Sequence, residues 1–244
     1  MKKIFKKIII RKIYLFLSSL IFLNKIRIKK YDKFKIKLDI TEYTQNALYF
    51  KNYDKKIRDF IKPFINGNEI FIDIGANIGF YTLYFSSLLP RGKIFAYEAN
   101  DKNYVKLKKN IKFNNFKNIN SYNLGISSYN GFANLVDASE YNEGGHYINT
   151  DKNLLKDKKI KKIKVYKLDK LLKEKKKKIF IKIDVEGHEC HVLNGMKQIL
   201  QLNNCILIIE TGQGNDLIYI KKFLKKYNYF EKKNFGINRV FFKN

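Results

Sequence analysis

The sequence predicts an α/β domain built on a doubly wound, mostly parallel sheet. The first observation is a short apolar run, residues 70–74, followed by a glycine-rich turn and a helical pattern from Phe80. The second is that four further apolar runs alternate with helix-like segments, which is the order of β-α-β units. The third is that acidic or amide side chains stand at the ends of these runs, where open α/β sheets bind ligands.

Each element follows from its apolar spacing and from the Gly, Pro or Asn residues that bound it. A short strand at residues 34–38 and a helix ending near Pro63 form a lead-in to the sheet. The predicted central strands are residues 70–74, 93–97, 118–126, 179–183 and 205–209. The predicted helices are residues 80–89, 103–114, 191–200 and 217–227. A short strand at residues 164–168 and a closing hairpin over residues 229–242 complete the chain.

Asn130-Gly131 is a hairpin signature, because both residues tolerate positive φ. We therefore expect residues 121–136 to form a β-hairpin added to the sheet. The glycine-rich stretch around His146 is expected to be a loop near a strand end, where substrate contacts are common.

Residues 1–32 form a basic, apolar N-terminal segment, and residues 33–244 are expected to be a single domain with its core at residues 68–211. The apolar run at residues 13–23 is too short to span a membrane, which takes roughly 20 residues. No small-residue cleavage site follows it. A basic helix lying in an anionic membrane surface through residues 1–30, and a helix packed on the domain, are both compatible with this pattern.

The net charge of +28 is unevenly distributed. Residues 1–37 hold 13 Lys or Arg against one acid, and residues 156–178 hold 13 Lys against three acids. Two such blocks fit an anionic membrane surface at least as well as nucleic acid, whose enzymes usually spread basic residues around the active cleft.

The turn after residues 70–74 reads Asp73-Ile-Gly75-Ala-Asn77-Ile-Gly79, and Glu98 ends the next predicted strand. Glycines let a ligand approach the backbone, and an acid at the end of the second strand suits ribose hydroxyls. A dinucleotide fold prefers Gly-x-Gly-x-x-Gly, and Asp73 would repel a pyrophosphate. S-adenosylmethionine has an ammonium, a carboxylate and a ribose but no phosphate, so it is the expected cofactor.

These residues, together with Lys182-Ile-Asp184-Val-Glu186-Gly187-His188-Glu189, resemble the FkbM-type methyltransferases over residues 70–210. The resemblance implies a class I, Rossmann-like fold and a reaction that is mostly O-methylation of sugars and secondary metabolites. It implies that the residues of the turn and Glu98 contact the cofactor. Asn123, near the end of the third predicted strand, is also expected to contact it. Where the family often has Glu-Pro, this chain has Glu98-Ala99.

Transfer to a neutral hydroxyl needs a general base near the transferred methyl group, at the end of the fourth strand. His188 titrates nearest neutral pH and is the expected base, with Asp184 orienting cofactor or substrate and Glu186 able to do either. His146 is a second candidate for the base. No His/Cys spacing suggests zinc, and nothing in the sequence requires a metal, although Asp184 and Glu186 are ligands of the kind magnesium uses.

The expected function is thus methyl transfer to a hydroxyl, with a sugar or surface-glycan precursor as the expected acceptor. A nucleic-acid methyltransferase is disfavoured, because the Asn/Asp-Pro-Pro-aromatic motif is absent at Asp184-Val-Glu186-Gly187. A non-catalytic, membrane-associated binding module is the remaining alternative. Cys190 and Cys205 lie in apolar segments and are expected to be reduced. The expected location is the cytoplasm, with the inner membrane face as an alternative.

Overall fold

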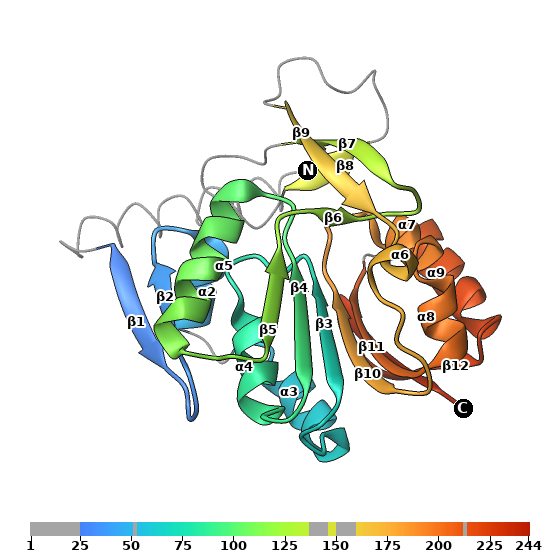
Figure 1. The fold of residues 1–244 in the computed structure, drawn as a ribbon, viewed down its shortest axis with the longest axis horizontal. Helices are drawn as coiled ribbons and strands as arrows, with labels where there is room; N and C mark the ends of the chain where they lie inside the picture. The colour runs from blue at the N-terminus through green and yellow to red at the C-terminus, as the bar shows by residue number, and fades with distance from the viewer. Residues whose placement is uncertain (1–24, 51–52, 137–145, 150–159, 212–213) are drawn as a thin grey trace, which may run out of the picture.

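The computed structural model describes residues 25–50, 53–136, 146–149, 160–211 and 214–244. Its centre is a seven-stranded sheet in the order β12-β13-β11-β10-β3-β4-β5 (Figure 1). The strands are β3 (Ile70–Ile74), β4 (Lys93–Tyr97), β5 (Ile119–Tyr122), β10 (Lys178–Ile183), β11 (Asn204–Glu210), β12 (Tyr229–Phe235) and β13 (Asn238–Lys243). β3, β4, β5, β10 and β11 are parallel, and the β12–β13 hairpin joins β11 antiparallel. The predicted fold class is confirmed.

Helices cover both faces of this sheet because alternate residues of the buried strands point to opposite sides. Phe71 and Phe180 pack with Phe85 on one face, whereas Ile72 and Ile181 belong to the core on the other. The helices of the first face are α3 (Lys55–Ile61), α4 (Phe80–Leu88) and α5 (Asp101–Asn114). Those of the second are α7 (Glu189–Asn194), α8 (Lys197–Leu202) and α9 (Asn215–Lys225). The described residues also form three short helices: α2 (Tyr43–Phe50), η1 (Lys62–Phe64) and α6 (Leu168–Leu171).

A second, four-stranded sheet lies above the carboxyl ends of β3, β4 and β5 (Figure 1). Its order is β6-β9-β7-β8, from β6 (Gly125–Ile126), β9 (Ile160–Tyr166), β7 (Gly131–Val136) and β8 (Tyr147–Asn149). The predicted hairpin over residues 121–136 is wrong, because β7 pairs with β8 and β9 instead. The Asn130 side chain accepts a hydrogen bond from the backbone N–H of Lys167.

Two predicted elements are each divided in two. The strand at residues 118–126 becomes β5 and β6, because Asn123 donates hydrogen bonds to the carbonyl oxygens of Glu98 and Ala99 and holds the bend between them. The helix at residues 191–200 becomes α7 and α8. The break falls at Gly195, whose backbone lies so close to the Ser127 carbonyl oxygen that a side chain there would overlap it.

The N-terminal part of the described chain is a hairpin of β1 (Ile26–Lys30) and β2 (Lys35–Asp39). Asn110 and Asn114 of α5 accept hydrogen bonds from the backbone of β2 and fix the hairpin to the domain. The basic end of the predicted N-terminal helix is therefore a strand. The rest of that helix, residues 1–24, lies outside the described residues, and the division of the chain at residue 32 stays a prediction. None of the described helices is both long and apolar enough to cross a bilayer.

Candidate active site

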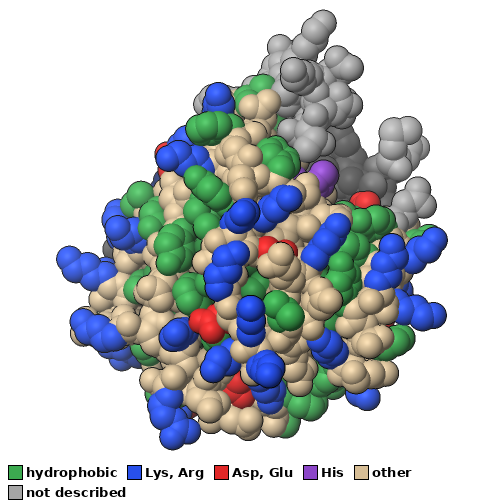
Figure 2. Space-filling model, turned by 45° about the vertical axis from the view of Figure 1, so that its right-hand side comes forward, with side chains coloured by type: hydrophobic (Ala, Val, Ile, Leu, Met, Phe, Trp, Pro, Cys, Tyr) green, Lys and Arg blue, Asp and Glu red, His purple; other side chains and the backbone are tan. Residues whose placement is uncertain are grey.

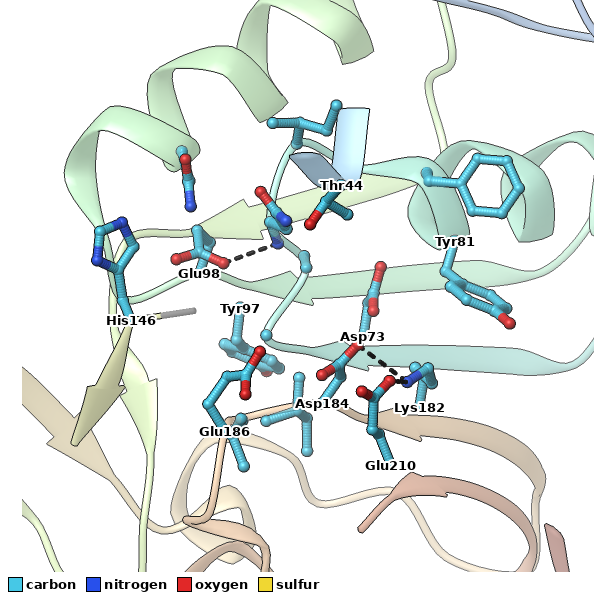
Figure 3. Close-up of a pocket in the computed structure, with 18 of the residues that line it drawn as sticks. Thr44, Asp73, Tyr81, Tyr97, Glu98, His146, Lys182, Asp184, Glu186 and Glu210 are labelled. Atoms are coloured by element: carbon cyan, nitrogen blue, oxygen red, sulfur yellow. Dashed lines mark hydrogen bonds and ion pairs between the residues drawn. The ribbon is translucent and has the colours of Figure 1, made fainter. Parts of the chain in front are cut away.

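A cavity of about 440 Å³ opens at the carboxyl ends of the parallel strands. The carboxyl ends of β3, β4, β10 and β11 line it, with the turns that follow the first three of these strands (Figure 3). The small sheet contributes Gly125, Ile126, Leu135 and Ile148, and His146 precedes β8. In an open parallel sheet all strands end at one edge, so segments far apart in sequence converge there. The predicted location of the site is thus where the structure has its cavity.

The turn after β3 is held open by backbone conformation. Gly75 and Asn77 both have positive φ, at 82° and 49°, and both line the cavity. The Gly75 N–H donates to the Tyr97 carbonyl oxygen at 3.0 Å, so the turn is fastened to the end of β4. The absence of a side chain at residue 75 makes room for the Asp184 carbonyl oxygen, which a Cβ there would overlap.

Gly79, predicted to contact the cofactor, lies at the start of α4 and packs against α5. It precedes α4 with a φ of 96°, and a Cβ there would stand 2.5 Å from the Leu107 side chain of α5. It is not among the residues that line the cavity. Its glycine is needed for the close packing of α5 against the turn.

Glu98 is buried at the end of β4 and is fixed by two backbone donors. Its carboxylate accepts from the N–H of Asn77 at 2.7 Å and from that of Asn100 at 2.8 Å. Burial raises the pKa of Glu98 to about 7, although these two hydrogen bonds act in the opposite direction. Each carboxylate oxygen keeps further acceptor capacity, which suits the two hydroxyls of a ribose.

Asp73, in β3, is the second acid on the side of the cavity that is predicted to bind the cofactor. Its side chain is buried and accepts a hydrogen bond from the Thr82 hydroxyl of α4 at 2.6 Å. Burial raises the pKa of Asp73 to about 6, partly offset by Thr82 and by the nearby Lys182 ammonium. A cationic ligand beside Asp73 would favour its ionised form.

Lys182 lines the cavity and had been assigned no role from the sequence. It stands in β10 with 2% of its side chain exposed, and its ammonium lies 3.1 Å from Asp184 Oδ2 and 3.8 Å from Glu210 Oε2 (Figure 3). Burial acts to lower the pKa of Lys182, but the charges of Asp184, Glu210 and Asp54 outweigh it, and the pKa is raised. The signal was present, since Lys182 is the charge in an otherwise apolar strand interior, Ile179–Ile183.

Glu186 projects into the cavity from the turn after β10. Its φ of 49° and that of Gly187, 95°, reverse the chain there. Burial and the charge of Asp184 raise the pKa of Glu186 to about 7. Asp184 lines the same part of the cavity, so two of the three predicted catalytic residues are brought together.

His188, the predicted general base, does not share the cavity with Asp184 and Glu186. Its ring is buried, its Nε2 is hydrogen-bonded to Ser127 Oγ at 3.0 Å, and it stacks on His191 with 4.4 Å between ring centroids. Burial, reinforced by His191, lowers the pKa of His188 to about 4. His188 is not among the cavity-lining residues, so this placement argues against the prediction that it is the base.

Two other predicted site residues are placed differently. Asn123 does not line the cavity and instead fastens the segment after β4, as described above. His146 does line it, on the same side as Glu98 and away from Lys182 and Glu210 (Figure 3). Two further lining residues, Tyr53 and Asp54, lie before α3, where nothing in the sequence had indicated a site.

The charge of the cavity is opposite to that of the molecule's exterior. Six carboxyl side chains line it, and among the described lining residues Lys182 is the single Lys or Arg. The acids are Asp54, Asp73, Glu98, Asp184, Glu186 and Glu210. Lysines and arginines are spread over the outer face instead (Figure 2). Such a cavity attracts a ligand with an ammonium and a sulfonium.

The fit to S-adenosylmethionine follows from these observations. Glu98 suits the ribose, the turn at Gly75 and Asn77 lines the cavity, and the acids favour the two positive centres of the ligand. Within the described ranges, no group of three or more His, Cys, Asp or Glu side chains could hold a metal ion. The fold and the site together define a class I methyltransferase that uses S-adenosylmethionine.

Comparison with known proteins gives the family. Residues 73–231 match the methyltransferase FkbM domain, and the chain belongs to that family. Hexuronic acid methyltransferase AglP of Haloferax volcanii is 28% identical over 161 residues, which cover 65% of this chain and 62% of AglP. The match thus spans about three-fifths of that relative's length.

Solved methyltransferases show only a loose likeness. TYW2 of M. jannaschii in complex with AdoMet has a TM-score of 0.47 and 13% identity, over 91% of this chain and 88% of that one. Precorrin-6y C5,15-methyltransferase of Geobacter metallireducens has a TM-score of 0.45 and 14% identity, over 78% and 88%.

Proposed function

We propose that this methyltransferase transfers the methyl group of S-adenosylmethionine to a hydroxyl oxygen of a sugar. The observation that carries the proposal is the acid cluster of Asp184, Glu186 and Glu210, which faces the cavity on the far side of β3 from Glu98. Sugar hydroxyls donate hydrogen bonds, and carboxylates accept them. The similarity to AglP, a hexuronic acid methyltransferase by name, supports a sugar as the class of acceptor.

Within this proposal Glu186 replaces His188 as the general base. S-adenosylmethionine supplies a methyl group activated by its positive sulfur. Glu186 takes the proton of the acceptor hydroxyl as the new oxygen–carbon bond forms and the carbon–sulfur bond breaks. A pKa of about 7 suits this task, because a base is most effective when its pKa lies near the working pH. Asp184, held by Lys182, positions the acceptor.

The experiment is incubation of the purified chain with methyl-labelled S-adenosylmethionine and a panel of sugars and surface-glycan precursors. The expected result is label in a methyl ether of one sugar class, identified by mass spectrometry. Label in none of the sugars, or in RNA or DNA added as competitor, would contradict the proposal.

A peripheral membrane location for the catalytic domain is a separate proposal. It is supported by the basic residues of the N-terminal segment, which would hold the enzyme near glycolipid acceptors at an anionic surface. Deletion should stop at residue 24, because β1 begins at Ile26 and pairs with β2. Loss of sedimentation with anionic vesicles on this deletion is expected, and equal sedimentation of both forms would refute membrane binding through this segment.

A further inference from the structure

The charges beyond β3 point to the class of sugar. Resting on the proposed function, we propose that the acceptor is a neutral sugar and that the corresponding uronate, with a carboxylate on the ring, is excluded. The inference concerns the acceptor end of the cavity, defined here by Asp184, Glu210 and Asn238.

The sheet order separates the two ends of the cavity. β4 lies on one side of β3 and is followed directly by Glu98. β10 and β11 lie on the other side, where Asp184 directly follows β10 and Glu210 ends β11. Figure 3 shows the same division, with Glu98 at one side and Lys182, Asp184 and Glu210 at the opposite side. A ribose held at Glu98 therefore leaves the β10–β11 side for the acceptor.

The cation at the acceptor end is already engaged. Lys182 Nζ is buried between Asp184 Oδ2 and Glu210 Oε2, at 3.1 and 3.8 Å, and lies 5.6 Å from the centre of the Tyr81 ring. Among the described residues that line the cavity, no other Lys or Arg could neutralise a carboxylate or phosphate of the acceptor. An anionic ring would thus sit among like charges.

The acceptor end also offers hydrogen-bond acceptors in excess. Asn238 donates a hydrogen bond from its amide nitrogen to Glu210 Oε2, at 3.5 Å. Ionised carboxylates accept hydrogen bonds but do not donate them, so Asp184 and Glu210, which line the cavity, call for donors from a ligand. A hydroxyl supplies such a donor, and a carboxylate does not.

A preference for a neutral sugar would distinguish this protein from AglP. AglP is called a hexuronic acid methyltransferase, and its similarity to this chain is 28%. Shared fold and reaction do not fix the acceptor, because specificity is a difference in affinity set by a few side chains. The acceptor end described here has the charge that disfavours such an acid.

The test compares two sugars that differ only at C6, methyl glucoside and methyl glucuronoside, with galactose and mannose pairs beside them. Methyl transfer is measured as kcat/KM at pH 8, and binding is measured by calorimetry on the enzyme loaded with S-adenosylhomocysteine. The neutral member of the preferred pair is expected to be favoured by about tenfold or more, since close like charges disfavour binding by at least this factor.

Glu210→Gln removes one negative charge at nearly constant shape and is expected to narrow the preference severalfold. Asp59→Asn makes the same kind of change at an exposed site outside the cavity and should leave the preference as it is. Equal or better use of the uronate by the unmodified enzyme, including formation of its methyl ester, would overturn this inference while leaving methyl transfer to sugars intact. Failure to methylate or bind any sugar would overturn the proposed function and this inference with it.

Discussion

The backbone of Gly75 lies against the carbonyl of Asp184, so closely that a Cβ at residue 75 would overlap the Asp184 oxygen. This contact joins the turn after β3, the predicted site of the cofactor, to the segment after β10, which carries Asp184 and Glu186. The two halves of the site are therefore positioned by direct backbone contact, without an intervening side chain.

Gly75→Ala is expected to destabilise the protein by about 2–4 kcal/mol and to weaken cofactor binding, because the added methyl must separate the two segments. Gly236→Ala is the matched control, since Gly236 has nearly the same φ, 84° against 82°, with no atom within 4 Å of the new Cβ. It should cost only the backbone strain, about 1–2 kcal/mol. Denaturant unfolding measures both, and equal losses would contradict the role of the contact.

Glu98→Gln should weaken binding of S-adenosylmethionine by about 10- to 100-fold, the usual effect of losing a charge-assisted hydrogen bond. The amide keeps the size of the side chain but cannot accept all the donors that the carboxylate holds. Calorimetric titration gives the dissociation constant directly. Asp59→Asn, at an exposed position, serves as the control, and unchanged affinity in Glu98→Gln would exclude Glu98 as the ribose ligand.

Glu186→Gln should lower kcat by about 10²- to 10⁴-fold with little change in cofactor affinity, because general base catalysis contributes about that much. A base acts in its deprotonated form, so the rate of the unmodified enzyme should rise as the pH increases through about 7, the raised pKa of Glu186. The pH–rate profile of the residual activity should lack this rise. If Glu186→Gln retains the rise in rate near pH 7, another group is the base.

His188→Gln distinguishes the two candidate bases. Since His188 is buried against Ser127 and His191, the change is expected to reduce the free energy of unfolding by about 1–3 kcal/mol. The rise in rate near pH 7 should occur at the same pH in this variant as in the unmodified enzyme. If the rise in rate near pH 7 shifts or disappears in His188→Gln, His188 is the base after all.

Lys182→Met should destabilise the protein more at pH 8 than at pH 5.5. Glu210 and Asp73 have pKa values raised to about 7 and about 6, so both are mostly ionised at the higher pH and need the ammonium there. Raised carboxyl pKa values mean that folding favours the protonated form, and stability is lost as the pH rises through them. Breaking a buried ion pair costs about 3–5 kcal/mol, which sets the expected loss at pH 8.

Lys178→Met is the control for this variant, because Lys178 stands at the other end of β10 and is partly exposed. It should cost less, and by a similar amount at both pH values. If the loss of stability in Lys182→Met is the same at both pH values, Lys182 contributes only through packing.

Local sequence was sufficient for the elements whose signals are local. The strand of residues 70–74, its glycine turn and Glu98 were predicted because apolar runs, turn residues and strand-end acids are contiguous in sequence. The hairpin at Asn130-Gly131 failed because strand pairing is decided by tertiary partners, and β9 lies about 30 residues further along the chain.

The site residues divide in the same way. Asp184, Glu186 and His188 are neighbours in sequence, but the positive φ of Glu186 and Gly187 turns the chain so that the acids face the cavity and the imidazole faces Ser127. No pattern in the sequence shows that reversal. Asn238 likewise reaches the site only through the pairing of β13 with β11.

The most direct test of the account is the product formed from methyl-labelled S-adenosylmethionine and a neutral sugar, analysed by mass spectrometry for the unmodified enzyme and for Glu186→Gln. A single methyl ether on a sugar hydroxyl is expected, with its formation nearly abolished in Glu186→Gln. A product whose label lies elsewhere, or whose rate of formation is the same in both proteins, would contradict it.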